Sequence, residues 1–212
     1  MTYWQIAHPL ILTGIGLPLF FVPVTALAQW IARWIGLMQQ GRIVLQAQLR
    51  FATLQTLATD AQPLVSCLMV TRQRFALARR AVGLFQRQSW KHKELVIVDD
   101  DHDDALVRWL RALDDPQIRV VKLAPGGHSL GSLRNRAVAA AGGDYVCQWD
   151  DDDLYDPARL QWQMAALQTL AADACFLQRW QLWWPEQCRL AVSRIRVWEG
   201  SMLCRKAVLP DY

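Results

Sequence analysis

From residue 63 onward the sequence alternates short apolar runs, rich in β-branched residues, with stretches whose apolar residues recur at helical spacing. Continuous apolar runs of this length are typical of strands that are buried on both faces. The alternation predicts an α/β fold, an open and mainly parallel sheet with helices on both faces. The predicted strands are 64–71, 95–98, 118–123 and 145–149, and a helix follows each of them, the last with Pro157 at its first position and its end near Leu170.

Polar side chains end three of these predicted strands. Thr71 ends the first, Asp99 and Asp100 end the second, and the run 150–153 of four aspartates follows the fourth. The carboxyl ends of parallel strands meet at one edge of a sheet, where ligands bind. Carboxylates gathered there repel one another unless a cation lies among them, and Mg²⁺ or Mn²⁺ prefers such oxygen ligands. The pattern therefore predicts a metal–diphosphate site.

Each of these motifs also has a simpler interpretation. Four consecutive aspartates can form a solvated acidic loop, and 99–104 can be a turn that caps a helix. Arg134 can be a surface residue of the helix expected over 130–140, which Ser129 would cap. The loop 150–153 does not fit an EF-hand, because it lacks the central Gly and the final Glu. What favours a site is that all the motifs fall at one sheet edge.

The charge and the cysteine content bear on the partner and on the redox compartment of the protein. The 212 residues include 23 Lys and Arg against 19 Asp and Glu, a net charge of +4 that gives no argument for a nucleic-acid partner. Ten of the 19 acids lie in the clusters 99–104 and 150–156, so the rest of the chain is basic. The five cysteines have no zinc-site spacing, and their odd number favours a reducing compartment.

The first 60 residues differ from the rest. No charged side chain precedes Arg33, and the run 10–28 is uncharged and nearly long enough to span a bilayer. Flanking tryptophans and the arginines that follow predict membrane association with the remainder of the chain on the cytoplasmic side. A buried helical hairpin, which would leave the protein cytoplasmic, and a signal peptide cleaved after Ala28 are the alternatives.

Three regions are expected on this basis. Residues 1–60 form an apolar, helical N-terminal segment, residues 61–170 the α/β domain with the strand-end site, and residues 171–212 a further region. Within the first region, 41–60 reads as an amphipathic connecting helix or, alternatively, as a surface helix of the next domain. Its apolar face comprises Val44, Ala47, Phe51, Leu54 and Leu57.

Residues 63–160 resemble the nucleotide-binding half of a family 2 glycosyltransferase with the glycosyltransferase-A (GT-A) fold. The resemblance rests on the order and spacing of motifs rather than on any single one. These are 63–71 (PLVSCLMVT), 95–100 (LVIVDD), 129–136 (SLGSLRNR) with 139–146 (AAAGGDYV), and 149–157 (WDDDDLYDP), the last similar to the family's Asp-x-Asp metal motif. Two departures are Asp101-His102 after the second strand and 72–74 (RQR) after the first.

The resemblance implies a role for each site residue. Asp150 and Asp152 form the metal pair for Mn²⁺ or Mg²⁺, and Asp150 also lies at the nucleotide. Asp153 either bonds to the donor sugar or holds the loop. Thr71 and Asp99 bind the nucleoside, with Asp100 as the alternative to Asp99, and Arg134 neutralises the diphosphate. The implied reaction moves a sugar from a nucleoside-diphosphate sugar, by default a UDP-sugar, to a hydroxyl of a glycan or lipid-linked acceptor in cell-surface polysaccharide synthesis, with inversion of the anomeric centre.

The resemblance also implies that 61–170 is the nucleotide-sugar-binding domain and that 171–212 is the start of an acceptor-side region, which is incomplete. The family's catalytic base usually lies beyond a strand that 198–205 resembles, so the base is unidentified and Glu199 is the candidate. Trp180, Trp183 and Trp184 are interpreted as core or interface residues before sugar-stacking ones. Other hypotheses are a non-catalytic nucleotide-sugar-binding domain of the same fold, a nucleotidyltransferase lacking its glycine-rich loop, and a membrane-attached interaction protein.

Overall fold

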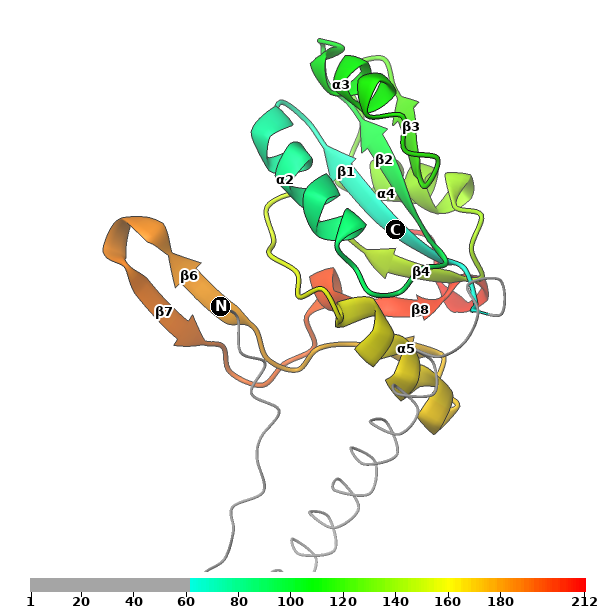
Figure 1. The fold of residues 1–212 in the computed structure, drawn as a ribbon, viewed down its shortest axis with the longest axis vertical. Coiled ribbons are helices and arrows are strands. Elements are labelled where there is room, and N and C mark those ends of the chain that lie inside the picture. Colours follow the sequence, from blue (N-terminus) through cyan, green and yellow to red (C-terminus); the bar gives the residue numbers. More distant parts are fainter. Residues whose placement is uncertain (1–61) are drawn as a thin grey trace, which may run out of the picture. The chain divides into compact units, whose positions relative to one another are not determined.

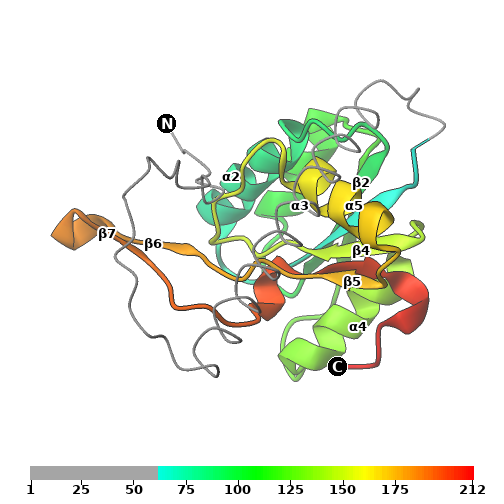
Figure 2. The same ribbon diagram turned by 90° about the horizontal axis from the view of Figure 1, so that it is seen from below.

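The computed structural model describes residues 62–212, so the predictions for residues 1–60 lie outside the described part. A six-stranded sheet forms the centre, with strand order β3-β2-β1-β4-β8-β5 (Figure 1). Its strands are β1 (Val65–Thr71), β2 (Lys93–Asp99), β3 (Ile118–Lys122), β4 (Tyr145–Gln148), β5 (Ala174–Cys175) and β8 (Leu203–Arg205). The first four are parallel, whereas β8 runs antiparallel between β4 and β5 (Figure 2).

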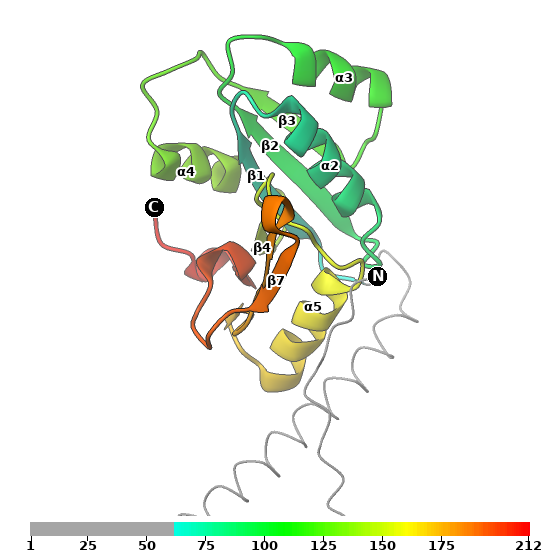
Figure 3. The same ribbon diagram turned by 90° about the vertical axis from the view of Figure 1, so that its left-hand side faces the viewer.

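Helices cover both faces of this sheet, as the apolar runs predict. The helices are α2 (Phe75–Gln86), α3 (Ala105–Leu113), α4 (Leu130–Ala140) and α5 (Arg159–Leu170). Alternate strand residues supply two hydrophobic clusters. Cys67, Leu95 and Cys147 pack with α2, α3 and α5, whereas Leu68 and Val96 pack under α4. Figure 3 shows α4 on the opposite side of the sheet from α2.

Local signals set several boundaries. Ser129 caps α4, since its hydroxyl accepts a hydrogen bond of 3.1 Å from the Ser132 amide. The prediction that Pro157 is the first residue of its helix is wrong. Pro157 lies one residue before Ala158, which is the N-cap of α5. The reason is a turn at Asp156, whose side chain accepts from the Ala158 amide and whose carbonyl accepts from the Arg159 amide.

The chain after α5 departs further from expectation. The strand predicted over 198–205 is reduced to β8, because Glu199–Ser201 forms a 3₁₀ turn, η3. Between β5 and η3 a separate two-stranded sheet is formed by β6 (Gln181–Trp184) and β7 (Arg189–Val192), joined by the 3₁₀ turn η2 (Pro185–Gln187). A last turn, η4, spans Lys206–Val208. Within residues 62–212 no helix is both long and apolar enough to cross a membrane.

Candidate functional site

The predicted convergence of polar groups at one sheet edge is found. Thr71 and Asp99 are register partners at the ends of β1 and β2, and β4 lies on the other side of β1. The buried Thr71 hydroxyl donates a hydrogen bond of 2.7 Å to Asp151 Oδ2 in the loop after β4. The two acidic motifs and Thr71 are therefore brought to one place by adjacent parallel strands.

Arg74 binds the acidic loop directly. Its Nη1 lies 3.1 Å from Asp151 Oδ1 and 3.0 Å from Asp152 Oδ2. The hydrogen bond to Asp151, followed by the charges of Asp151 and Asp152, raises the pKa of Arg74 above its usual value. Asp151 is only 3% exposed, whereas Asp152 is exposed, so Asp151 anchors the loop and Asp152 faces solvent. Arg80 of α2 adds a hydrogen bond of 2.8 Å to the Asp152 carbonyl.

Asp150 and Asp153 lie in less hydrated surroundings. Asp150 Oδ1 accepts a hydrogen bond of 2.8 Å from Gln148 Nε2. Burial raises the pKa of Asp150, and the charge of Asp152 raises it further. Burial, then the charges of Asp150 and Asp152, raises the pKa of Asp153 to about 6. The buried Tyr155 hydroxyl bonds to the backbone of Asp150 and lies 3.4 Å from Asp153 Oδ2, which fixes the loop.

The aspartates after β2 are both buried, at 1% exposure each. Lys122 Nζ at the end of β3 lies 3.2 Å from Asp99 Oδ2, while Asp99 Oδ1 accepts from the Asp101 amide. Asp100 Oδ1 accepts a hydrogen bond of 3.2 Å from the Gly126 amide. Asp99 thus has partners on both oxygens, and a small pocket beside it is lined by Thr71, Gln73, Arg74, Phe75, Asp99, Asp101, Asp103 and Leu106.

Arg134 comes from the other face of the sheet, on α4. Its guanidinium carbon lies 5.2 Å from the centroid of the Tyr212 ring, and its Nε is buried without a hydrogen-bond partner among the described residues. Its positive charge is one of the influences that lower the pKa of Asp150. Arg134 is therefore electrostatically coupled to the metal motif.

The segment around η3 closes on Asp150. A Cβ on Gly200 would lie 2.9 Å from Asp150 Oδ2 and 3.1 Å from Trp180 Cη2. Trp180 stacks on Trp198 with ring centroids 4.9 Å apart. Glu199 is exposed and directly precedes Gly200. The candidate base therefore belongs to the segment that contacts the acidic motif, although no interaction of its carboxylate with that motif was found.

A buried polar network holds this segment from behind. Arg159 of α5 is 2% exposed, and its Nη2 donates to the Gln148 carbonyl at 3.1 Å and to the Gly200 carbonyl at 3.4 Å. Gln163 Nε2 donates to the Ser201 carbonyl at 2.7 Å. Arg159 also stacks on Tyr155, 4.4 Å from its ring centroid. The network fixes η3 relative to the end of β4.

These carboxylates bear on the predicted metal. Within 62–212 no three His, Cys, Asp or Glu side chains are grouped closely enough to hold an ion by themselves. Mg²⁺ and Mn²⁺ commonly use only one or two carboxylates together with substrate phosphates. Asp150 and Asp152 are suited to that mode. Burial and the charge of Asp152 raise the pKa of Asp150, and a bound cation would stabilise the ionised form of both carboxylates.

Several residues of the site were missed in the sequence. Lys122 follows the same strand-end pattern as Asp99 and could have been found from it. Arg74 appeared only as a departure from a motif, and Arg159 gave no signal. Trp180, Trp183 and Trp184 are interpreted from the sequence as core or interface residues. Trp183 and Trp184 are not core residues, since they are 49% and 37% exposed on the β6–β7 hairpin, and an interface role for them stays a prediction.

The sheet with its antiparallel β8, the helices on both faces and the acidic loop after β4 together define a GT-A-type fold. The chain belongs to glycosyl transferase family 2, since the model of that family matches residues 66–181. It is 35% identical over 114 residues to WcaA of Escherichia coli (strain K12), named for glycosyl transfer in colanic acid biosynthesis, covering 53% of this chain and 40% of WcaA.

Two further comparisons agree. The chain is 31% identical over 108 residues to the succinoglycan biosynthesis protein ExoO of Rhizobium meliloti (strain 1021), covering 49% of this chain and 30% of ExoO. The crystal structure of S. aureus TarS 1-349 matches with a TM-score of 0.50 and 16% identity, over 69% of this chain and 48% of that one. The chain spans less than half the length of these curated relatives.

Proposed function

We propose that this protein transfers a sugar from a nucleoside-diphosphate sugar to an acceptor hydroxyl with the help of a divalent metal ion. The observation that carries the proposal is the meeting of Thr71, Asp99 and the loop 150–153 at the ends of three adjacent parallel strands. Ligands bind at this edge of such sheets, and the family to which the chain belongs is one of glycosyl transferases.

On the donor side, the nucleoside would lie against Thr71 and Asp99, with Asp100 as the alternative contact. The position of Thr71 and Asp99 as register partners at the ends of β1 and β2 supports this assignment. Arg134 would bind the diphosphate, since its buried Nε lacks a hydrogen-bond partner among the described residues. A UDP-sugar is the default donor from the family resemblance.

Asp150 and Asp152 would hold Mn²⁺ or Mg²⁺, and such an ion supplies charge stabilisation to the departing diphosphate. Asp153, half-buried beside Tyr155, would accept a hydrogen bond from the donor sugar. Arg74 would move away from Asp152 when the metal ion and donor bind, because the guanidinium and the metal ion compete for the same carboxylate. Asp151 would stay bound to Thr71 and preserve the loop.

On the acceptor side, the acceptor oxygen would form a bond to the anomeric carbon as the bond to the diphosphate breaks. A carboxylate must take the hydroxyl proton, and Glu199 is the candidate because it directly precedes Gly200, which packs on Asp150. Attack from the face opposite the leaving group inverts the anomeric centre. The alternative is a domain of the same fold that binds the donor without transferring the sugar.

The names of WcaA and ExoO support a role in cell-surface polysaccharide synthesis with a glycan or lipid-linked acceptor. The uncharged run 10–28 and the arginines after it support membrane association with the catalytic domain on the cytoplasmic side. Carbonate extraction of membranes, with protease access from each side, tests the location. Release of the chain into the soluble fraction would contradict it.

Calorimetry with UDP and Mn²⁺ tests the donor site. Asp152→Asn should weaken binding at least tenfold, whereas Asp144→Asn, an exposed aspartate before β4, should leave it unchanged. Equal affinities for a folded Asp152→Asn variant and the wild type contradict the metal assignment once GDP, dTDP and CDP have also been tried. Transfer assays with a panel of nucleotide sugars, with and without Mn²⁺, then separate the enzyme from the binding domain.

A further inference from the structure

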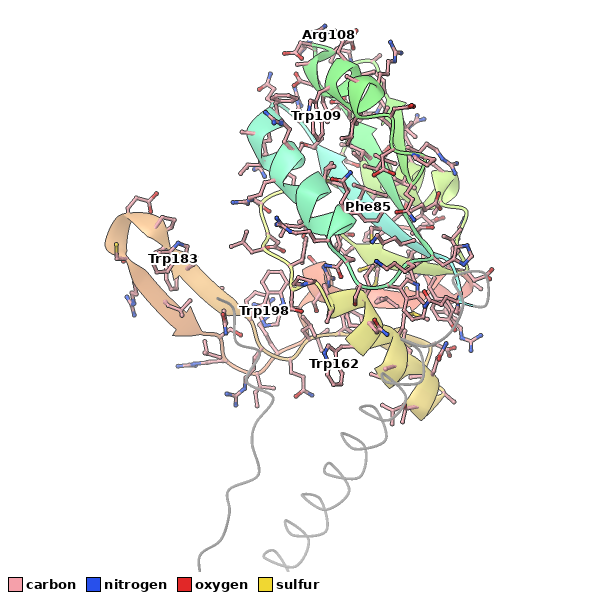
Figure 4. The ribbon with its side chains drawn as sticks, viewed as in Figure 1. Phe85, Arg108, Trp109, Trp162, Trp183 and Trp198 are labelled. Atoms are coloured by element: carbon pink, nitrogen blue, oxygen red, sulfur yellow. The ribbon has the colours of Figure 1, made fainter. Side chains whose placement is uncertain are left out.

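Among the described residues, β6 and β7 pair only with each other, and the hairpin extends away from the main sheet (Figures 1 and 2). Its register places Trp183 opposite Leu190 and Gln181 opposite Val192, so these four residues share one face. Figure 4 shows Trp183 on the hairpin, away from the helices that cover the sheet. A two-stranded hairpin is marginally stable in water unless something covers a face of it.

That face is apolar and exposed. Trp183 is 49% exposed, and Leu190 and Val192 are each 60% exposed. Ile195 and Val197, just after β7, are 62% and 67% exposed. Exposed apolar residues gathered in one short segment, rather than scattered singly, mark an interaction surface.

The same segment is strongly basic. Between residues 176 and 198 there are four arginines and a single acid, Glu186, a net charge of +3. All four guanidinium groups are on exposed residues, and two of them lie over tryptophan rings, Arg189 over Trp184 and Arg196 over Trp198. The four arginines are Arg179, Arg189, Arg194 and Arg196.

This combination identifies the occupant by its chemistry. Tryptophan and arginine are suited to the boundary between lipid headgroups and acyl chains, where an aromatic body is buried and a cation meets phosphate. A second copy of the same hairpin would bring four arginines against four arginines, which is unfavourable. An anionic bilayer complements both the apolar face and the charge.

We propose that the β6–β7 hairpin docks on an anionic lipid bilayer. Trp183, Leu190 and Val192 enter the headgroup boundary, and Arg179, Arg194 and Arg196 bind lipid phosphates. Arg189 lies with Trp184 on the other face of the hairpin and adds only its charge. This contact lies in the folded domain and is separate from the apolar run 10–28. It does not depend on sugar transfer, and it would hold the expected acceptor-side region 171–212, to which the hairpin belongs, close to the lipid surface.

Cys188 offers a local probe, because it is exposed at the turn between the two strands while Cys67, Cys147 and Cys204 are buried. The full chain is labelled there with the environment-sensitive dye NBD and mixed with vesicles of phosphatidylcholine, with or without 30% phosphatidylglycerol. We expect NBD emission to rise at least twofold and shift to shorter wavelength only with the anionic vesicles. Nitroxide-labelled lipid should quench it.

Variants make the test specific. Trp183→Ser with Leu190→Ser should abolish the NBD response, whereas Leu170→Ser, an exposed leucine of α5, should leave it intact. The Cys188→Ser protein, treated with the same dye, serves as the control for NBD attached to the other cysteines. An unchanged NBD signal on anionic vesicles that carry the chain in flotation overturns the proposal, because the chain is then bound elsewhere. A response that needs no lipid and grows with protein concentration also overturns it, in favour of self-association.

Discussion

Thr71 at the end of β1 and Asp151 after β4 are 80 residues apart in the chain, yet a buried hydrogen bond of 2.7 Å joins their side chains. This bond links the strand that forms the centre of the sheet to the acidic loop. The bond fixes Asp151, which has Asp150 before it and Asp152 and Asp153 after it in the chain. The Thr71 hydroxyl is therefore the buried anchor of a loop that Arg74, Arg80 and Tyr155 also hold.

Replacing Thr71 by Val should destabilise the fold, because the buried Asp151 carboxylate loses a donor. A hydrogen bond to a charged group contributes about 1.5–3 kcal/mol, and we expect the free energy of unfolding in urea to fall by that amount. Thr71→Ser keeps the hydroxyl and should lose less than half as much. Equal losses for the two variants would show that the methyl group, not the hydrogen bond, is what matters.

Gly200→Ala should damage the site from the acceptor side. The added Cβ would lie 2.9 Å from Asp150 Oδ2, so the carboxylate or the η3 turn must shift, at a cost of about 1–3 kcal/mol in unfolding free energy. UDP–Mn²⁺ binding should weaken as well. The matched control is Gly83→Ala in α2, where nothing lies within 4 Å and helix formation should gain about 0.5–1 kcal/mol. Similar behaviour of the two variants would contradict the contact.

Arg74 and a metal ion should compete for Asp152. We expect Arg74→Gln to raise the affinity for Mn²⁺ alone about threefold or more, since a competing cation 3.0 Å from Asp152 is removed. Electron paramagnetic resonance of free Mn²⁺ measures this without nucleotide. Adding Asp152→Asn to the Arg74→Gln protein should remove the gain. A lower Mn²⁺ affinity in Arg74→Gln would mean that Arg74 supports the ion site rather than occupying it.

Lys93 makes stability depend on pH away from the site. Burial lowers the pKa of Lys93 to about 8 in the folded chain, where its Nζ donates to the Gln88 carbonyl at 2.7 Å. The unfolded chain then binds more protons between pH 8 and about 10.4, so stability should rise with pH in that window and be independent of this group below it. The rise should be about 1–2 kcal/mol greater than in Lys93→Met, as measured by urea unfolding. If the unfolding free energies of the wild type and Lys93→Met change in parallel with pH, the lowered pKa of Lys93 is disproved.

The sequence was sufficient to predict the strands of the parallel half. For β1, β2 and β4, burial on both faces leaves an apolar run that is easy to recognise, whereas the edge strand β3 is only partly buried. Their polar ends then predicted the site edge, and the acidic clusters met there as expected. β8 was harder, since only Leu203–Arg205 pairs with β4 and the residues before it form a turn instead. Three residues carry too little pattern to separate a strand from a loop.

Pairing among side chains escaped prediction for a different reason. Arg159 is buried because carbonyl groups from β4 and η3 surround it, and nothing near position 159 in the sequence indicates that. Trp183 and Trp184 are of a residue type common in cores, but they belong to a hairpin on which they stay 49% and 37% exposed. Long-range contacts and the lack of them are properties of the assembled fold, which one sequence does not display.

The place of β8 in the sheet has a consequence for biosynthesis. A ribosome releases β4 before residues 203–205, and at roughly 5–20 residues per second a nascent chain spends several seconds with that strand edge unpaired. An open edge is a template for pairing with another chain. The backbone N–H of Gln148, which donates to the Met202 carbonyl at 3.0 Å, also lacks its acceptor until Met202 has been made. The edge of β4 is therefore paired only after residues 203–205 have been made, and slow elongation or weak chaperone capacity would prolong its exposure.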